Sequence, residues 1–75
     1  ELRGSFEESA AWFTKAIELN PDHIEHYYQL AVTYDMMGEE EKMRDPLEKL
    51  LTLEPTEDED EEFQQKAKEM LEDLD

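Results

Sequence analysis

The 75-residue chain has no cysteine, few basic residues and no long hydrophobic run. Without cysteine it can form neither disulfides nor thiolate metal sites. Its aliphatic runs reach only about three residues, whereas a membrane-spanning helix needs roughly 20. Apolar and polar residues nowhere alternate with a period of two, so no strands are expected. A chain of this length forms at most one small domain, which buries only about 60% of its unfolded surface.

Basic residues are scarce because the chain is strongly acidic, with 23 Asp and Glu against 7 Lys and Arg and a formal net charge of −16. Binding to nucleic acid or to an anionic membrane surface depends on clustered Lys and Arg, so both are excluded as functions. Electrostatic steering favours basic partners instead. The alternative is that the acidity belongs to a salt-adapted organism and has no specific role. The chain starts with Glu1 and not Met, so we expect a fragment, and we expect a cytoplasmic location.

Two segments, 4–21 and 38–55, repeat each other with a period of 34 residues, since Gly4 returns as Gly38 and Pro21 as Pro55. Glu, Lys and Leu also recur at matching positions. A fixed period in this range is typical of architectures built from stacked helical units. Such architectures supply binding surfaces more often than reaction centres.

Helical spacing and stop signals predict four antiparallel helices, near residues 5–19, 22–37, 39–53 and 58–74, and therefore an all-α fold. Gly38 is expected to end the second helix. Pro46 lies inside the third, where we expect a kink and not a break, because the apolar spacing continues past it. Thr56 and Glu59 have the spacing of a capping box at the start of the fourth helix.

The second and third helices together resemble one tetratricopeptide repeat. The matching residues are Tyr27, Leu30, Ala31, Tyr34, Gly38, Met43, Leu47, Leu50 and Pro55. The first helix resembles the second half of a preceding repeat, through Gly4, Ser9, Phe13, Ala16, Leu19 and Pro21. The resemblance implies a single domain over 1–75, with half a repeat at 4–21, a full repeat at 22–57 and a C-terminal capping helix at 58–75. The implied fold is a fragment of an α-solenoid.

In tetratricopeptide arrays the first helix of each repeat lines a concave groove that binds peptides. Carried over by position, the resemblance implies groove residues Glu25, Tyr28, Val32, Asp35 and Met36, which Glu62, Lys66 and Glu69 of the last helix could extend. The Lys and Asn that grip chaperone C-termini in well-known members are replaced here by Tyr and Val. An acidic groove with apolar side chains suits a peptide with basic and apolar residues. The resemblance therefore implies a protein–protein interaction module.

Two other functions compete with this interpretation. The chain could be a structural end-cap or dimerisation piece of a longer array, without a ligand groove of its own. In that case the face of the first helix with Phe6, Ala10, Phe13 and Ile17 is expected to be only partly covered and to form a weak homodimer. A chaperone for basic proteins rests on charge alone.

No catalytic constellation is evident in the sequence, so we expect neither enzyme activity nor a cofactor. His23 and His26 have a spacing that could direct two imidazoles toward one metal ion, but a third fixed ligand is missing from the pattern. The acidic run from Glu57 to Glu62 lacks the central glycine of a calcium loop. Carboxylates at a helix start simply complement the helix dipole. We therefore expect no metal site.

Overall fold

The computed structural model describes residues 2–74, with side chains from residue 4 onward, so the two end positions of the predicted 1–75 domain lie outside the described residues. This part of the chain forms four α-helices: α1 (Leu2–Leu19), α2 (Ile24–Met37), α3 (Glu40–Leu51) and α4 (Asp60–Leu74). None of its residues is in a strand. The predicted all-α, four-helix fold is confirmed. The predicted starts at 22, 39 and 58 were one to two residues early.

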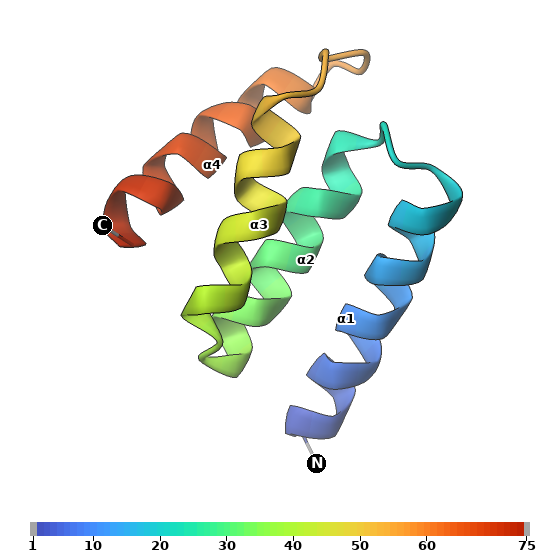
Figure 1. Ribbon diagram of the computed structural model, residues 1–75, viewed down its shortest axis with the longest axis vertical. Coiled ribbons are helices and arrows are strands. Elements are labelled where there is room, and N and C mark those ends of the chain that lie inside the picture. The colour runs from blue at the N-terminus through green and yellow to red at the C-terminus, as the bar shows by residue number, and fades with distance from the viewer. Residues whose placement is uncertain (1, 75) are drawn as a thin grey trace.

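Successive helices pack side by side and run in opposite directions, in a helical repeat-like arrangement (Figure 1). Helix α2 lies at the centre and contacts α1, α3 and α4, and α3 also contacts α4. In the part of the chain described, no Cα atom of α1 comes within 8 Å of one in α3 or α4. Helix α1 therefore packs mainly on α2. None of the described helices is both long and apolar enough to span a bilayer.

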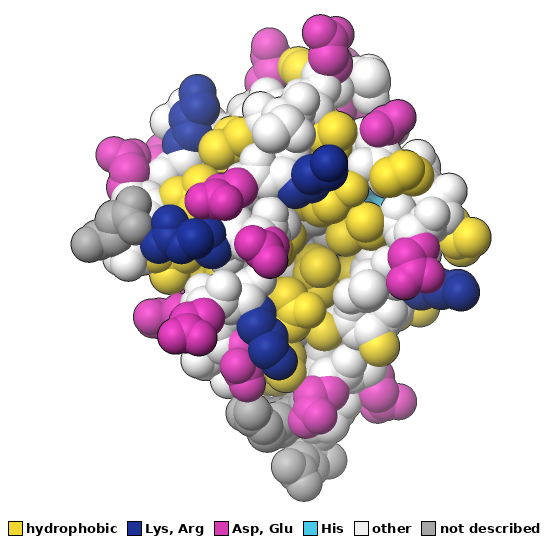
Figure 2. Space-filling model, viewed as in Figure 1, with side chains coloured by type: hydrophobic (Ala, Val, Ile, Leu, Met, Phe, Trp, Pro, Cys, Tyr) yellow, Lys and Arg dark blue, Asp and Glu magenta, His cyan; other side chains and the backbone are white. Residues whose placement is uncertain are grey.

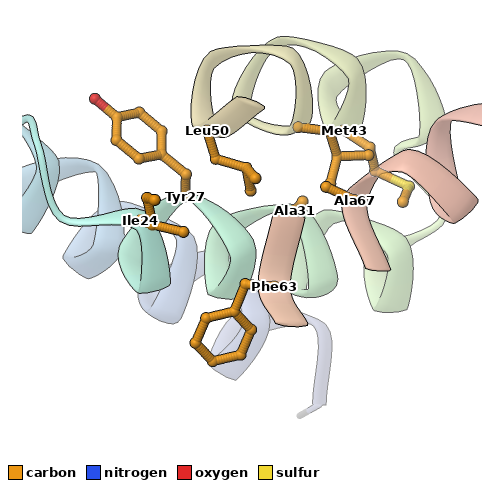
Figure 3. Packing of buried hydrophobic residues seen from close by; sticks show 8 residues of the cluster. Ile24, Tyr27, Ala31, Met43, Leu50, Phe63 and Ala67 are labelled. Carbon is orange, nitrogen blue, oxygen red and sulfur yellow. The ribbon is translucent and has the colours of Figure 1, made fainter. Parts of the chain in front are cut away.

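The hydrophobic core lies where α2, α3 and α4 meet (Figure 3). Two alanines, Ala31 of α2 and Ala67 of α4, are completely buried and let the helix backbones approach closely. Leu47 and Leu50 of α3 are also completely buried. The remaining buried members of this cluster are Ile24, Tyr27, Met43 and Phe63. Because all three helices contribute buried side chains, the removal of any one of them would expose part of this core to water.

The helix ends explain where the chain turns. Gly38 ends α2 in the left-handed conformation, with a φ of 77°, and the next N–H, that of Glu39, donates to the Tyr34 carbonyl at 2.9 Å. Helix α3 runs through Pro46 without a break. At its C-terminus the side-chain amide of Gln64, from α4, donates to the carbonyl oxygens of Leu50 (3.2 Å) and Leu53 (2.8 Å). Gln64 thereby adds a donor at the end of a helix, where the last carbonyls lack their usual intrahelical partners.

The start of α4 is fixed by Asp60, which is 3% exposed although it is charged. Its Oδ2 accepts the backbone N–H groups of Thr56 (2.8 Å) and Glu57 (3.0 Å), and the Thr56 hydroxyl lies at 3.4 Å. The predicted capping box assigned this position to Glu59, and that assignment was wrong. Helix α4 begins at Asp60, two residues later than the predicted start at 58, so the carboxylate that reaches back is that of Asp60.

Asp60→Ala is expected to destabilise the fold by about 1–3 kcal/mol, because the backbone N–H groups of Thr56 and Glu57 lose the carboxylate oxygen that accepts both of them. Asp58→Ala is the matched control: Asp58 is exposed in the same loop, so its removal should stay within about 0.5 kcal/mol. Urea unfolding followed by circular dichroism compares the two variants. Equal unfolding midpoints would mean that the loop is held by something other than Asp60.

The predicted association face of α1 is partly covered, as expected. Ala10 is buried against the rest of the fold, whereas Phe6, Phe13 and Ile17 are half-buried. The most exposed apolar side chains of α1 lie elsewhere on the helix: Trp12 is 62% exposed and Leu19 is 78% exposed.

Candidate binding face of helix α2

The five residues predicted to line a groove, Glu25, Tyr28, Val32, Asp35 and Met36, all lie on α2. Their spacing of three, four, three and one residues places them on one side of the helix, which we call the α2 face. They are not equally accessible: Asp35 is exposed and Met36 is 63% exposed, whereas Glu25, Tyr28 and Val32 are half-buried. The α2 face therefore presents an exposed thioether and a partly exposed valine between carboxylates.

Tyr28 has a second role that the sequence pattern did not reveal. Its ring stacks on that of Phe63 from α4, with ring centroids 4.8 Å apart and an angle of 27° between the planes. Such an offset aromatic pair contributes about 0.5–1.5 kcal/mol beyond the area that it buries. Tyr28 therefore packs the α2 face against α4. Its ring is held in place by Phe63 and is not free to rearrange around a bound partner.

Helix α4 borders the α2 face with charged side chains. Lys66 forms an ion pair with Glu62 across one helical turn, with Nζ 3.3 Å from Oε2. The hydrogen bond between Lys66 and Glu62 and the negative charge of Glu62 raise the pKa of Lys66, and the nearby Tyr28 adds to this rise. Glu62 and Glu69 are exposed. Because Lys66 is already engaged by Glu62, the border of the α2 face keeps its net negative character.

An aromatic cluster connects the other side of α2 to α1. The indole ring of Trp12 lies edge-on to Phe13 (5.1 Å between centroids) and to His26 of α2 (6.1 Å). His23, just before α2, lies 4.3 Å from the His26 ring. The cluster packs the middle of α1 against the beginning of α2.

The surroundings of His26 in this cluster shift its pKa. Burial and then the neighbouring His23 lower the pKa of His26 from its usual value of 6.5, and Glu25 offsets part of that effect. The Nδ1 atom of His26 is buried, and it has no hydrogen-bond partner among the described residues. An imidazole in such surroundings is held neutral at physiological pH, because the charged form is poorly solvated.

The lowered pKa predicts that acidification weakens the fold. The unfolded chain takes up a proton near pH 6.5, whereas folded His26 resists protonation until lower pH. The free energy of unfolding should therefore be highest above the pKa of the unfolded chain. It should fall as the pH drops from there toward the lower pKa of folded His26. His26→Gln should flatten this part of the curve, as measured by urea unfolding at a series of pH values. Parallel curves for the two proteins would contradict the assignment.

The two histidines do not build a metal centre with their neighbours. Among the described residues, no group of three or more His, Cys, Asp or Glu side chains is placed so that it could hold a metal ion. His23 instead lies between two carboxylates, 3.9 Å from Glu25 and 4.0 Å from Glu57. The Glu57 contact joins the start of α2 to the loop before α4.

The family model of regulator of microtubule dynamics protein 1-3 matches residues 2–75, and the chain belongs to this family. No curated protein and no solved structure matches the chain. The assignment to the tetratricopeptide family was wrong. Its spaced small, aromatic and proline positions describe how helical hairpins pack, and a different family meets the same packing requirements.

Proposed function

We propose that the chain is a protein-interaction module that binds a basic and apolar segment of a partner protein through the α2 face. The observation that carries this proposal is the exposure of Met36, 63%, beside the exposed carboxylate of Asp35. Val32 adds a second, half-buried apolar contact on the same side. Apolar anchors give such a contact its affinity, and the surrounding carboxylates select cationic flanks.

The charge of the whole chain supports the same partner chemistry. A net charge of −16 on a small body attracts cationic segments from a distance and repels acidic ones. The described ion pairs between Lys or Arg and Glu, such as Lys15 with Glu18 and Arg44 with Glu48, are exposed and join neighbouring turns of one helix. They leave the excess of carboxylates over basic groups unchanged.

The family name adds a cellular context to this binding activity. The matching family is described as a regulator of microtubule dynamics. We propose that this chain contributes to such regulation in the cytoplasm, without enzyme activity or cofactor, by holding a partner protein. The predicted internal division at 4–21, 22–57 and 58–75 remains a proposal.

Met36→Lys tests the α2 face. The change places a cation on the proposed contact surface at a position that is exposed, so the fold should tolerate it. Ala11→Lys, at an exposed position of α1, makes the same change in net charge and is the control. Both variants are tested for binding to an array of peptides that differ in their number of Lys and Leu residues. Peptides that bind the Ala11→Lys control should bind Met36→Lys with an affinity that is roughly tenfold lower. Equal binding by both variants would refute the α2 face as the site.

The microtubule context is tested separately with purified tubulin. If the chain acts through the α2 face, wild-type protein and Ala11→Lys should alter filament growth or shrinkage to the same extent, and Met36→Lys should alter it less. An effect that is identical for all three proteins would place the activity on another surface. No effect of any of them would contradict a direct role of this chain in filament dynamics.

A structural end-cap or dimerisation role is a second candidate function, and the exposed Trp12 and Leu19 of α1 favour it. Burying them in a symmetric homodimer would remove two large apolar side chains from water. Net charge opposes such a dimer, so it should be weak and strengthen in about 0.5 M salt. Sedimentation at high protein concentration is the measurement, with Trp12→Ser expected to remain monomeric. A monomeric wild-type chain under those conditions would eliminate this candidate.

A further inference from the structure

A second open surface lies on the opposite flank of α2, in a groove between α1 and α3. Both helices pack on α2 without approaching each other, and they leave a groove of about 550 Å³. Figure 2 shows hydrophobic side chains gathered in the middle of this side of the molecule, between the places that α1 and α3 occupy in Figure 1. Ile17 and Pro46 form its walls, and Tyr27 and Leu30 of α2 line it between them. None of these residues belongs to the α2 face.

The three hydroxyl groups that line the groove already donate hydrogen bonds inside the chain. The Tyr27 hydroxyl donates to the Pro21 carbonyl at 2.7 Å. The Thr14 hydroxyl donates to the Ala10 carbonyl at 2.8 Å, and that of Thr52 to the Lys49 carbonyl at 2.7 Å. With these donors turned toward the chain's own carbonyls, the groove offers mainly apolar surface. Its occupant must therefore be apolar where it touches the groove.

The size of the groove and the charge around it define the rest of the occupant. The lining residues of α3 and its C-cap run from Asp45 to Thr52, about two helical turns. Its rim carries Asp45, Glu48 and Lys49, and Glu48 is bridged by Arg44 at 3.8 Å, so the rim itself is close to balanced. Beyond the rim, the net charge of −16 disfavours any acidic partner, including a second copy of this chain.

We propose that this groove binds an amphipathic helix that inserts two apolar side chains, one turn apart, and carries Lys or Arg beside them. A helix lying in a groove between two helices uses its i and i+4 side chains as anchors, which matches a groove whose α3 wall is about two turns long. The site is separate from the α2 face and does not depend on the function proposed for that face. The chain thus has two binding surfaces on opposite flanks of one helix.

The test uses a synthetic amphipathic helical peptide of Leu and Lys, titrated into the whole chain and followed by nuclear magnetic resonance. Amide signals of Thr14, Lys49 and Thr52 should shift. A second peptide with the same lysines but with Ser in place of Leu should produce no saturable shift at these positions. Saturable binding of the Ser peptide there would mean that charge alone drives the contact, and it would overturn the proposal.

Thr14→Arg and Ala11→Arg form the matched pair of variants. Both positions are exposed on α1, but only Thr14 lines the groove. Thr14→Arg should weaken binding of the Leu and Lys peptide by about tenfold relative to Ala11→Arg, because its side chain occupies the groove. Equal affinities, or signal shifts confined to Val32 and Met36, would overturn the groove as the site. Sedimentation without peptide tests whether a second copy of the chain occupies the groove instead. Dimers of the wild-type chain that Thr14→Arg abolishes would show this and contradict the proposal.

Discussion

Leu47→Ala is expected to unfold a visible fraction of the protein at room temperature. Leu47 is completely buried in the core formed by α2, α3 and α4, and such truncations cost about 2–5 kcal/mol because they leave a cavity. A domain of this size has a total stability of about 5 kcal/mol, so one such change removes much of it. Urea unfolding followed by circular dichroism measures the loss.

The neighbouring residue supplies the control for this experiment. Glu48 has a side chain that is 57% exposed, and Glu48→Ala should change stability by no more than about 0.5 kcal/mol. Leu30→Ala should fall between the two, because Leu30 is 7% exposed but lies at the floor of the open groove and outside the central cluster. If Leu47→Ala and Glu48→Ala unfold at the same urea concentration, the core has been placed wrongly.

Added sodium chloride is expected to raise the melting temperature by several degrees. The chain has 23 acidic and 7 basic residues, so its excess carboxylates repel one another in the compact folded state. The unfolded chain relieves that repulsion by expanding. Ions at about 0.15 M screen interactions beyond roughly 8 Å, and about 1 M salt screens nearly all of them. The closest described ion pair of a basic side chain, Lys66 with Glu62 at 3.3 Å, lies on the surface, where such pairs contribute about 0–1 kcal/mol.

Thermal unfolding at increasing salt concentrations checks this expectation. Replacing the exposed Glu72 by Gln and Asp73 by Asn, both in the last turn of α4, should raise the melting temperature at low salt and have much less effect at about 1 M salt. A melting temperature that falls as salt is added would mean that local ion pairs outweigh the general repulsion. It would also remove the electrostatic argument for a salt-adapted composition.

The sequence was sufficient to predict the number and order of the helices because the signals for them are local. Apolar spacing marks each helix, and Gly38 ends α2 by adopting a backbone conformation that other residues avoid. The same local pattern could not identify the family. Period and small-residue positions follow from how helical hairpins pack, and the family model of regulator of microtubule dynamics proteins, not that of tetratricopeptide proteins, matches residues 2–75.

Features that join distant segments could not be predicted in this way. Gln64 caps α3 from α4, and its partners Leu50 and Leu53 lie 14 and 11 residues away. The stacking of Tyr28 on Phe63 depends on where α4 docks, which no local spacing specifies. The groove between α1 and α3 likewise exists only because both helices pack on α2 with no Cα atom of one within 8 Å of the other. The helical periodicity of α2 did place the five candidate residues on one side.

A charge-swap cycle measured by isothermal titration calorimetry tests the binding role of the α2 face most directly. Asp35 is exposed on this face, next to Met36. Asp35→Lys should weaken binding of a peptide of Lys and Leu by about tenfold and should improve binding of the same peptide with one Lys replaced by Glu. A coupling of this sign would place the peptide's cation beside Asp35. If Asp35→Lys changes the affinity for both peptides by the same factor, the cation does not meet Asp35, and the α2 face is not the binding site.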